Sequence, residues 1–160
     1  MRRYAAINEA DGELWALAGL LHDFDYERWP EPPDHTCEGA KILRNEGFDE
    51  EIIGAILSHA PWNLDDFPRD RPIRKTLFAV DELCGLIYAA ALVRPERMNG
   101  MKTKSILKKM KQKAFAAAVS REDIHEGAAL IALPLADHVH HCIEAIASIA
   151  AEIDLLPPTN

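Results

Sequence analysis

Histidine and aspartate residues fall at the ends of apolar segments in the first half of the chain. His22 and Asp23 directly follow an apolar stretch, and His35 stands at the start of the next predicted helix. His59 ends the helix after that, and Asp81 lies inside a long apolar segment further on. Imidazole and carboxylate groups are the usual ligands of first-row divalent metal ions where thiolates are absent. Convergence of these five side chains would form a metal site inside a helical bundle.

Each of these residues also has an ordinary structural explanation. A His-Asp dipeptide arises often by chance, and a histidine at a helix C-terminus interacts favourably with the helix dipole. A buried aspartate is costly unless it is paired or bound to a metal, and Asp81 has Arg74 and Lys75 nearby in the sequence as partners. Taken singly, each residue is better explained by structure than by metal binding. Their combination in one chain favours a metal site.

The segments that carry these residues have the periodicity of α-helices. Apolar residues recur at three- and four-residue spacing, and no stretch alternates at period two for long enough to predict a strand. Asp49 and Ser120 are placed to cap helices, because short polar side chains accept hydrogen bonds from the first free backbone amides. The sequence therefore predicts an all-α bundle, folded as a single domain over residues 1–160. The expected helices span residues 13–21, 34–46, 50–59, 73–93, 102–113, the segment that starts at Ser120, and 134–155, with a proline-bounded loop over 61–72.

Length and composition exclude several classes of protein. With 160 residues, 48% of them apolar and 28% charged, the chain has the size and balance of one globular domain. Its net charge of −8 argues against a module that binds nucleic-acid duplexes, and no apolar run approaches the roughly 18 residues that cross a bilayer. Polar residues interrupt the N-terminal segment, unlike a secretory signal. Three scattered cysteines without a CxxC pair (Cys37, Cys84 and Cys142) indicate a reducing compartment, so we expect a cytoplasmic protein without membrane contact.

Two segments combine these features most clearly: LAGLLHDFDYER, which contains His22 and Asp23, and LFAVDELCGLI, which contains Asp81. They resemble the central and distal motifs of the HD superfamily of metal-dependent phosphohydrolases. Many members carry two further histidines between these motifs, and these match His35 in DHTCEGAKIL and His59 in AILSHAPW. The later stretch KTKSILKKMKQKAFAAAVSRED is similar to the C-terminal part of a subgroup of predicted HD hydrolases. The resemblance covers most of the chain and implies an HD-domain-like helical bundle.

The resemblance also implies a ligand set and a reaction. By the family pattern, His22 and Asp81 hold a first divalent ion, which the pattern leaves open as Mn, Fe, Mg, Ni, Co or Zn. Asp23, His35 and His59 are implied as catalytic residues: the aspartate bridges to a second ion where one is present, and the histidines bind that ion or contact the phosphate. Metal-activated water would then hydrolyse a small phosphate ester such as a nucleotide. A glycine-rich phosphate loop is not required.

The chain departs from the family pattern before His22. The family's first histidine lies on a helix that precedes the His-Asp pair, whereas none of the 21 residues before His22 is a histidine. We therefore expect the chain to be N-terminally incomplete relative to the family, or to have lost this ligand. The last predicted helix offers replacement ligands, although a solvated polar face is the favoured interpretation of these residues: Asp137, His138, His140 and His141.

A run of lysines follows the long predicted helix. Six lysines lie within residues 102–113 of an otherwise acidic chain, and most are expected to form an exposed, solubilising helix face. Lys102 and Lys104, which are closest to the turn at Asn99-Gly100, are the candidates for contacts with the substrate phosphate. A groove for single-stranded nucleic acid would carry aromatic residues among these bases, and the run has none.

Three other interpretations compete with the phosphohydrolase. Some HD-fold relatives use two irons to activate dioxygen with an overlapping ligand set, so the metal would separate an oxygenase from a hydrolase. An HD-like domain without its first ligand would serve as a regulatory or interaction module. A plain helical bundle with unrelated histidines would leave His22, Asp23 and Asp81 pointing apart. The phosphohydrolase predicts a small phosphorylated substrate as its partner, and it is compatible with a homo-oligomer.

Overall fold

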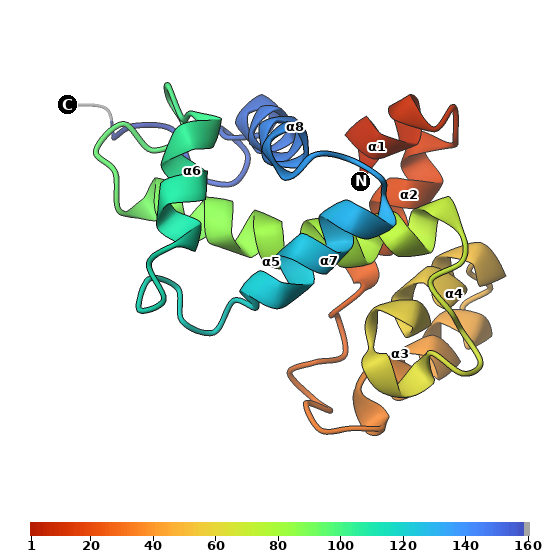
Figure 1. The fold of residues 1–160 in the computed structure, drawn as a ribbon. Helices are drawn as coiled ribbons and strands as arrows, with labels where there is room; N and C mark the ends of the chain where they lie inside the picture. The colour runs from red at the N-terminus through yellow and green to blue at the C-terminus, as the bar shows by residue number, and fades with distance from the viewer. Residues whose placement is uncertain (159–160) are drawn as a thin grey trace. The chain divides into compact units, whose positions relative to one another are not determined.

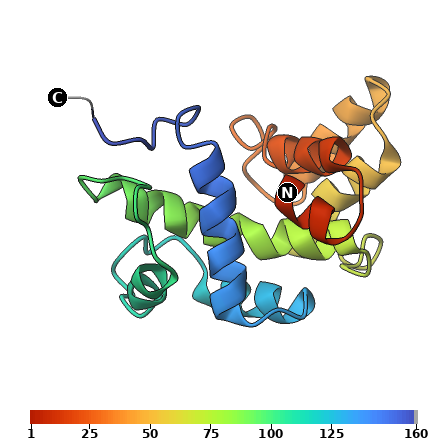
Figure 2. The same ribbon diagram turned by 90° about the horizontal axis from the view of Figure 1, so that it is seen from above.

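Residues 1–158 are described by a computed structural model, and every regular element among them is a helix. The prediction of an all-α fold is confirmed, because no strand occurs within these residues (Figures 1 and 2). The elements are α1 (Arg2–Ile7), α2 (Gly12–Leu21), α3 (Asp34–Asn45), α4 (Glu50–His59), the short 3-10 helix η1 (Pro61–Asn63), α5 (Pro72–Leu92), α6 (Thr103–Met110), α7 (Arg121–Leu130) and α8 (Leu135–Ser148).

Backbone contacts divide the chain into two compact units. The first runs from Met1 to Phe78 and the second begins at Ala79, so the boundary falls within α5. The prediction of one domain over residues 1–160 stays a prediction. No helix in the described part of the chain is both long and apolar enough to cross a membrane.

The first unit is organised around helix α4. This helix contacts both α2 and α3, and α1 contacts α2. Ile53 and Ile56 on α4 are fully buried, as is Ala18 on α2. Each fully buried isoleucine side chain stabilises the fold by about 1.5–3 kcal/mol. The apolar stripe that predicted α4 from the sequence is therefore part of the core of this unit.

Side-chain caps fix where two of these helices begin. The carboxylate of Asp11 accepts hydrogen bonds from the backbone amides of Glu13 and Leu14 at the start of α2. Asp49 accepts one from the amide of Glu51 at the start of α4, which confirms the predicted cap. Such caps contribute about 1 kcal/mol each, and they account for the close match between predicted and observed helix starts.

The start of α3 differs from the predicted helix. Two residues near its beginning have non-helical backbone angles: His35 has φ −54° and ψ 135°, and Thr36 has φ 65° and ψ −35°. The regular helix thus begins after Thr36, although the predicted end near residue 46 agrees with the observed end at Asn45. This break turns the His35 side chain out of the helical repeat.

The second unit contains α6, α7 and α8 together with the part of α5 from Ala79 onward. Helix α8 contacts both α6 and α7 in this unit. Gly127 on α7 lies so close to α5 that an added Cβ would come within 2.5 Å of the Cα of Ala79. Ser120 caps α7 by accepting a hydrogen bond from the amide of Asp123, as predicted. Glu82 accepts a further bond from the amide of Ser120, which ties this cap to α5.

Two predicted helix ends in the second unit are wrong. The lysine-rich helix ends at Met110 rather than at residue 113, because Ile106 and Met110 are buried whereas Ala114, one turn later, is exposed. The last helix ends at Ser148 rather than near residue 155. After Ser148 the chain continues in turns, and Asp154 has a positive φ of 55°. The next residue, Leu155, is fully buried.

Candidate metal centre

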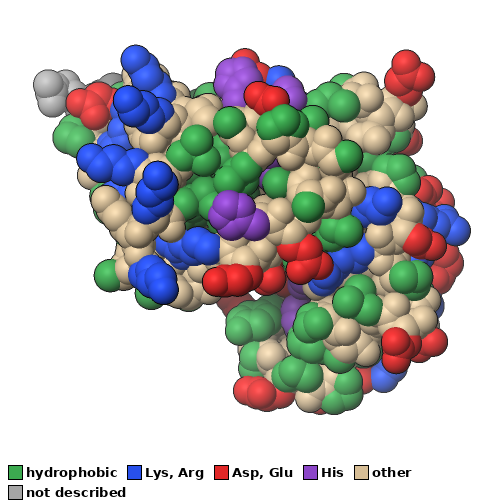
Figure 3. Space-filling view, viewed as in Figure 1, with side chains coloured by type: hydrophobic (Ala, Val, Ile, Leu, Met, Phe, Trp, Pro, Cys, Tyr) green, Lys and Arg blue, Asp and Glu red, His purple; other side chains and the backbone are tan. Residues whose placement is uncertain are grey.

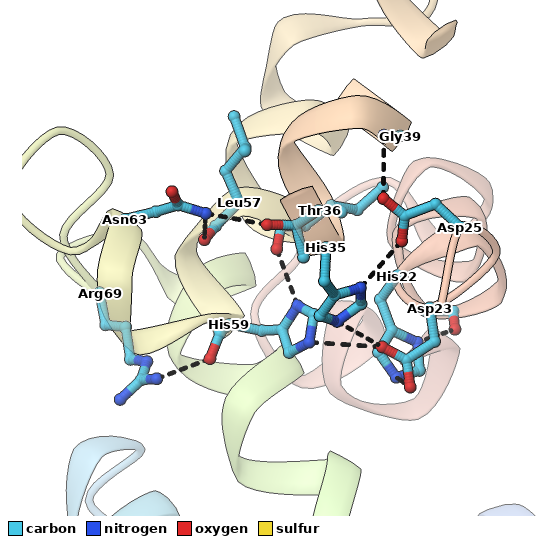
Figure 4. Close-up of polar contacts among 12 residues, drawn as sticks. His22, Asp23, Asp25, His35, Thr36, Gly39, Leu57, His59, Asn63 and Arg69 are labelled. Atoms are coloured by element: carbon cyan, nitrogen blue, oxygen red, sulfur yellow. Dashed lines mark hydrogen bonds and ion pairs between the residues drawn. The ribbon is translucent and has the colours of Figure 1, made fainter. Parts of the chain in front are cut away.

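The first histidine of the site lies at the end of α2. His22 is the C-terminal cap of this helix, and its ring Nδ1 donates a hydrogen bond to the carbonyl of Gly19 at 2.9 Å. Nε2 of the same ring lies 3.5 Å from Oδ2 of the neighbouring Asp23. The helix end therefore orients the ring so that Nε2 faces the carboxylate (Figure 4).

The second histidine occupies the matching position on α4. His59 is the last residue of this helix, and its Nδ1 donates to the carbonyl of Ile56 at 2.8 Å. Its Nε2 lies 3.4 Å from Oδ1 of Asp23. The rings of His22 and His59 meet edge to face, with their centroids 5.3 Å apart.

The third histidine comes from the irregular start of α3. His35 is buried, and its Nδ1 donates to Oδ1 of Asp25 at 2.9 Å, while its Nε2 lies 3.3 Å from Oδ1 of Asp23. Asp25 is only 2% exposed, and its other carboxylate oxygen accepts a hydrogen bond from the amide of Gly39. A Cβ at residue 39 would lie 2.6 Å from that oxygen, so only glycine leaves room for the carboxylate.

All three rings are held in the same protonation pattern. Each Nδ1 faces an acceptor, a backbone carbonyl for His22 and His59 and a carboxylate for His35. Nδ1 must therefore carry the proton in the neutral ring, and the lone pair is on Nε2. A hydrogen bond from the opposite ring nitrogen is also what orients histidines that bind metals.

Three nitrogen lone pairs that face one carboxylate need a cation among them. Without one, the lone pairs of Nε2 and the negative oxygens of Asp23 repel each other. Donor atoms of Asp23, His35 and His59 all lie within 4.8 Å of one another. The separations of 3.3 and 3.4 Å between Asp23 and these two rings match the edge of about 3.3 Å expected for a tetrahedron with bonds near 2.05 Å. The residues fit a divalent metal ion.

The charge of Asp23 agrees with this interpretation. The pKa of Asp23 is lowered by these rings in their protonated form, in which a proton on Nε2 takes the place of the cation. The largest cause is a hydrogen bond from protonated His59, the positive charges of His22, His59 and His35 add to it, and burial acts in the opposite direction. The carboxylate is thus ionised at neutral pH, as a metal ligand must be. Its side chain is 51% exposed, so that solvent and small molecules reach it.

Two residues that support the histidines were not predicted from the sequence. Asp25 follows the His-Asp pair by two positions, and a second aspartate in a polar loop carries no sign that it is buried. Arg69 caps the end of α4: its Nε and Nη2 donate to the carbonyls of Ser58 and His59, at 3.0 and 2.8 Å. Its guanidinium also stacks on the ring of Phe78, and this fixes the position of the helix end that carries His59.

Aromatic side chains flank the buried histidine. Tyr26 and Trp62 approach the ring of His35, with centroid distances of 5.1 and 6.1 Å. Both are exposed, so a ligand that reaches the centre from solvent would meet aromatic surface.

The remaining predicted site residues belong to the second unit. Asp81 is half-buried on α5, and Arg74, one partner suggested for it, forms an ion pair with Asp70. Lys102 and Lys104 are exposed at the start of α6, where Figure 3 shows basic side chains gathered. The roles of Asp81 as a ligand and of the two lysines as phosphate contacts stay predictions.

The interpretation of α8 as carrying a solvated polar face is wrong for one residue. His138 is fully buried, and its Nε2 donates to the carbonyl of Ala79 at 2.8 Å. Burial lowers the pKa of His138, an effect that this hydrogen bond partly offsets. His140 is exposed and pairs with Glu144, as expected of a solvated face. His138 lies one turn from the buried Cys142, and this places it beside the apolar stripe.

Comparison with known proteins agrees with the geometry. A family model described as HD domain matches residues 1–140 of the chain. HD domains bind divalent metal ions and are commonly metal-dependent hydrolases. No curated protein and no solved structure matches the chain. Because the match covers most of its length, the chain belongs to the HD domain family.

Proposed function

We propose that this protein is a metal-dependent phosphohydrolase that acts on a small phosphate ester such as a nucleotide. One observation carries the proposal: three histidines present their Nε2 atoms to the single carboxylate of Asp23, at 3.3 to 3.5 Å. That arrangement is built from three separate helix ends. Family membership supports the reaction class.

Three histidines and Asp23 would bind the metal ion, and Asp23 would also take part in catalysis. His22, His35 and His59 would hold a divalent cation through Nε2, with Asp23 as the anionic ligand. When bound, such a cation supplies Lewis acidity, which activates water for attack and neutralises charge on the phosphoryl oxygens. Since Asp23 is partly exposed, it would also accept a hydrogen bond from the attacking water and orient it toward the phosphorus.

The donor set bears on the choice of metal. Three imidazoles and one carboxylate suit Mn, Fe, Co, Ni or Zn better than Mg, which prefers oxygen ligands. By the family pattern, Asp81 would be a further metal ligand, and Lys102 and Lys104 would contact the substrate phosphate. We also propose a cytoplasmic location, without a nucleic-acid duplex or membrane as a partner.

Elemental analysis together with phosphatase assays tests the proposal. The purified protein should contain about one or two equivalents of a transition metal and release phosphate from aryl phosphates or nucleoside monophosphates. His35→Ala and His59→Ala should lose metal and activity together. His125→Ala, on the exposed face of α7, is the matched control and should keep both.

Two results would overturn the phosphohydrolase. Iron with oxygen consumption and no phosphatase activity would favour the oxygenase. A carefully purified protein that binds none of the six candidate metals would favour a regulatory or interaction module.

A further inference from the structure

The residue that follows His35 has an unusual backbone conformation. Thr36 has φ 65°, in the left-handed region that β-branched residues rarely adopt. Its side chain is fully buried, so the strain is not relieved by exposure to water. Conformations of this kind persist only where surrounding contacts hold them.

One side chain supplies such contacts. Nδ2 of Asn63 donates hydrogen bonds to Oγ1 of Thr36 at 2.9 Å and to the carbonyl of Leu57 at 3.1 Å. Oδ1 of the same amide accepts a bond from the thiol of Cys37 at 3.5 Å. Figure 4 shows the amide of Asn63 directed toward Thr36 at the start of α3 and toward the carbonyl of Leu57 on α4.

These bonds connect two segments that each carry a histidine of the site. Thr36 and Cys37 directly follow His35, and Leu57 lies two residues before His59. The two rings lie 5.4 Å apart between centroids, and both direct Nε2 at the same oxygen of Asp23. Loss of the amide bridge would free the start of α3 to shift relative to the end of α4.

We propose that Asn63 is a positioning residue, which sets the spacing of the His35 and His59 rings and so prepares the centre for its metal ion. This inference rests on the proposed metal site. An amide is suited to the role because it offers two donors on one atom and an acceptor on the other. An aspartate of the same shape could not donate to either Thr36 or Leu57.

The first test measures metal affinity by titration with Co²⁺. Asn63→Asp should weaken the affinity by about 10- to 100-fold, as for other residues that orient metal ligands. Asn45→Asp, the same change at an exposed position on α3, is the control and should have the affinity of the parent chain. Thr36→Ser keeps the hydroxyl acceptor and should retain affinity, whereas Thr36→Val removes the acceptor and should lose it. Thr36→Val also tests the bridge from its other end if Asn63→Asp does not fold.

The second test is made on the metal-free protein. Histidine ring ¹⁵N spectra should change at His35 and His59 in Asn63→Asp, while the signals of His125, on the exposed face of α7, stay as in the parent chain. A lower melting temperature with unchanged Co²⁺ affinity and unchanged ring spectra would overturn the inference, because Asn63 would then stabilise the fold only. If the parent chain itself binds no Co²⁺, the proposed function fails, and the ring spectra alone decide whether Asn63 positions the two histidines.

Discussion

Replacing Asp25 by asparagine tests how the site orients its buried histidine. The carboxylate accepts two hydrogen bonds, from Nδ1 of His35 and from the amide of Gly39, each at 2.9 Å. An asparagine has only one oxygen, so its NH₂ group must face one of these two donors in either orientation. With 2% exposure at this position, water cannot replace the lost acceptor.

The expected loss of metal affinity in Asp25→Asn follows from the one hydrogen bond that the asparagine cannot accept. A hydrogen bond to a charged group contributes about 1.5–3 kcal/mol, and residues that orient metal-binding histidines typically change metal affinity by about 10- to 100-fold. At about 1.4 kcal/mol for each factor of ten, the two estimates agree. We therefore expect Asp25→Asn to raise the dissociation constant for Co²⁺ or Mn²⁺ by one to two orders of magnitude.

Isothermal titration calorimetry on the folded variant provides the measurement. Asp65→Asn makes the same chemical change at an exposed position and should leave the metal affinity as in the parent chain. A folded Asp25→Asn variant that binds metal within twofold of the parent would refute the reasoning. The orientation of His35 would then not depend on this carboxylate.

Three further changes have definite expected outcomes. Gly39→Ala would place a methyl group against the carboxylate of Asp25, so it should lower the free energy of unfolding in urea by about 1–3 kcal/mol and also weaken the metal affinity. An unchanged urea midpoint would contradict the close contact between residue 39 and this carboxylate. Arg69→Lys keeps the charge but loses at least one bond to the end of α4, and should lower the unfolding free energy by about 1 kcal/mol in the same assay. The lowered pKa of His138 means that the unfolded chain takes up its proton first, so stability should fall as the pH drops below about 6.5. His138→Gln should reduce this loss between pH 7.5 and 5.5, and an identical pH dependence would exclude His138 as its source.

Helices were largely predictable because their signals are local. Apolar residues at helical spacing and caps such as Asp49 and Ser120 determine most of the boundaries. The non-helical Thr36 was not predictable, because its conformation runs against the preference of a β-branched residue and is held by contacts from η1. The turn before Leu155 likewise depends on burial of that side chain rather than on its neighbours in sequence.

The ligands of the site were predictable in part, because only a few residue types can bind a metal ion. A histidine at a helix end is visible in the sequence, and family resemblance singled out His22, His35 and His59. Their convergence on Asp23 depends on how α2, α3 and α4 pack, which periodicity does not determine. Burial explains what was missed, since Asp25 and His138 look like surface residues until the surrounding structure is known.

One metal ion at this centre would join three segments of the chain. The ion would therefore act as a removable cross-link within the first unit. Because the donors come from the ends of α2 and α4 and the start of α3, they come together only when these helices are folded. A metal present at 100 times its dissociation constant would then stabilise the folded unit by about 2.7 kcal/mol. Chelators should accordingly lower the melting temperature of this part of the chain. The supply of metal would then control the stability of the folded protein as well as its proposed activity.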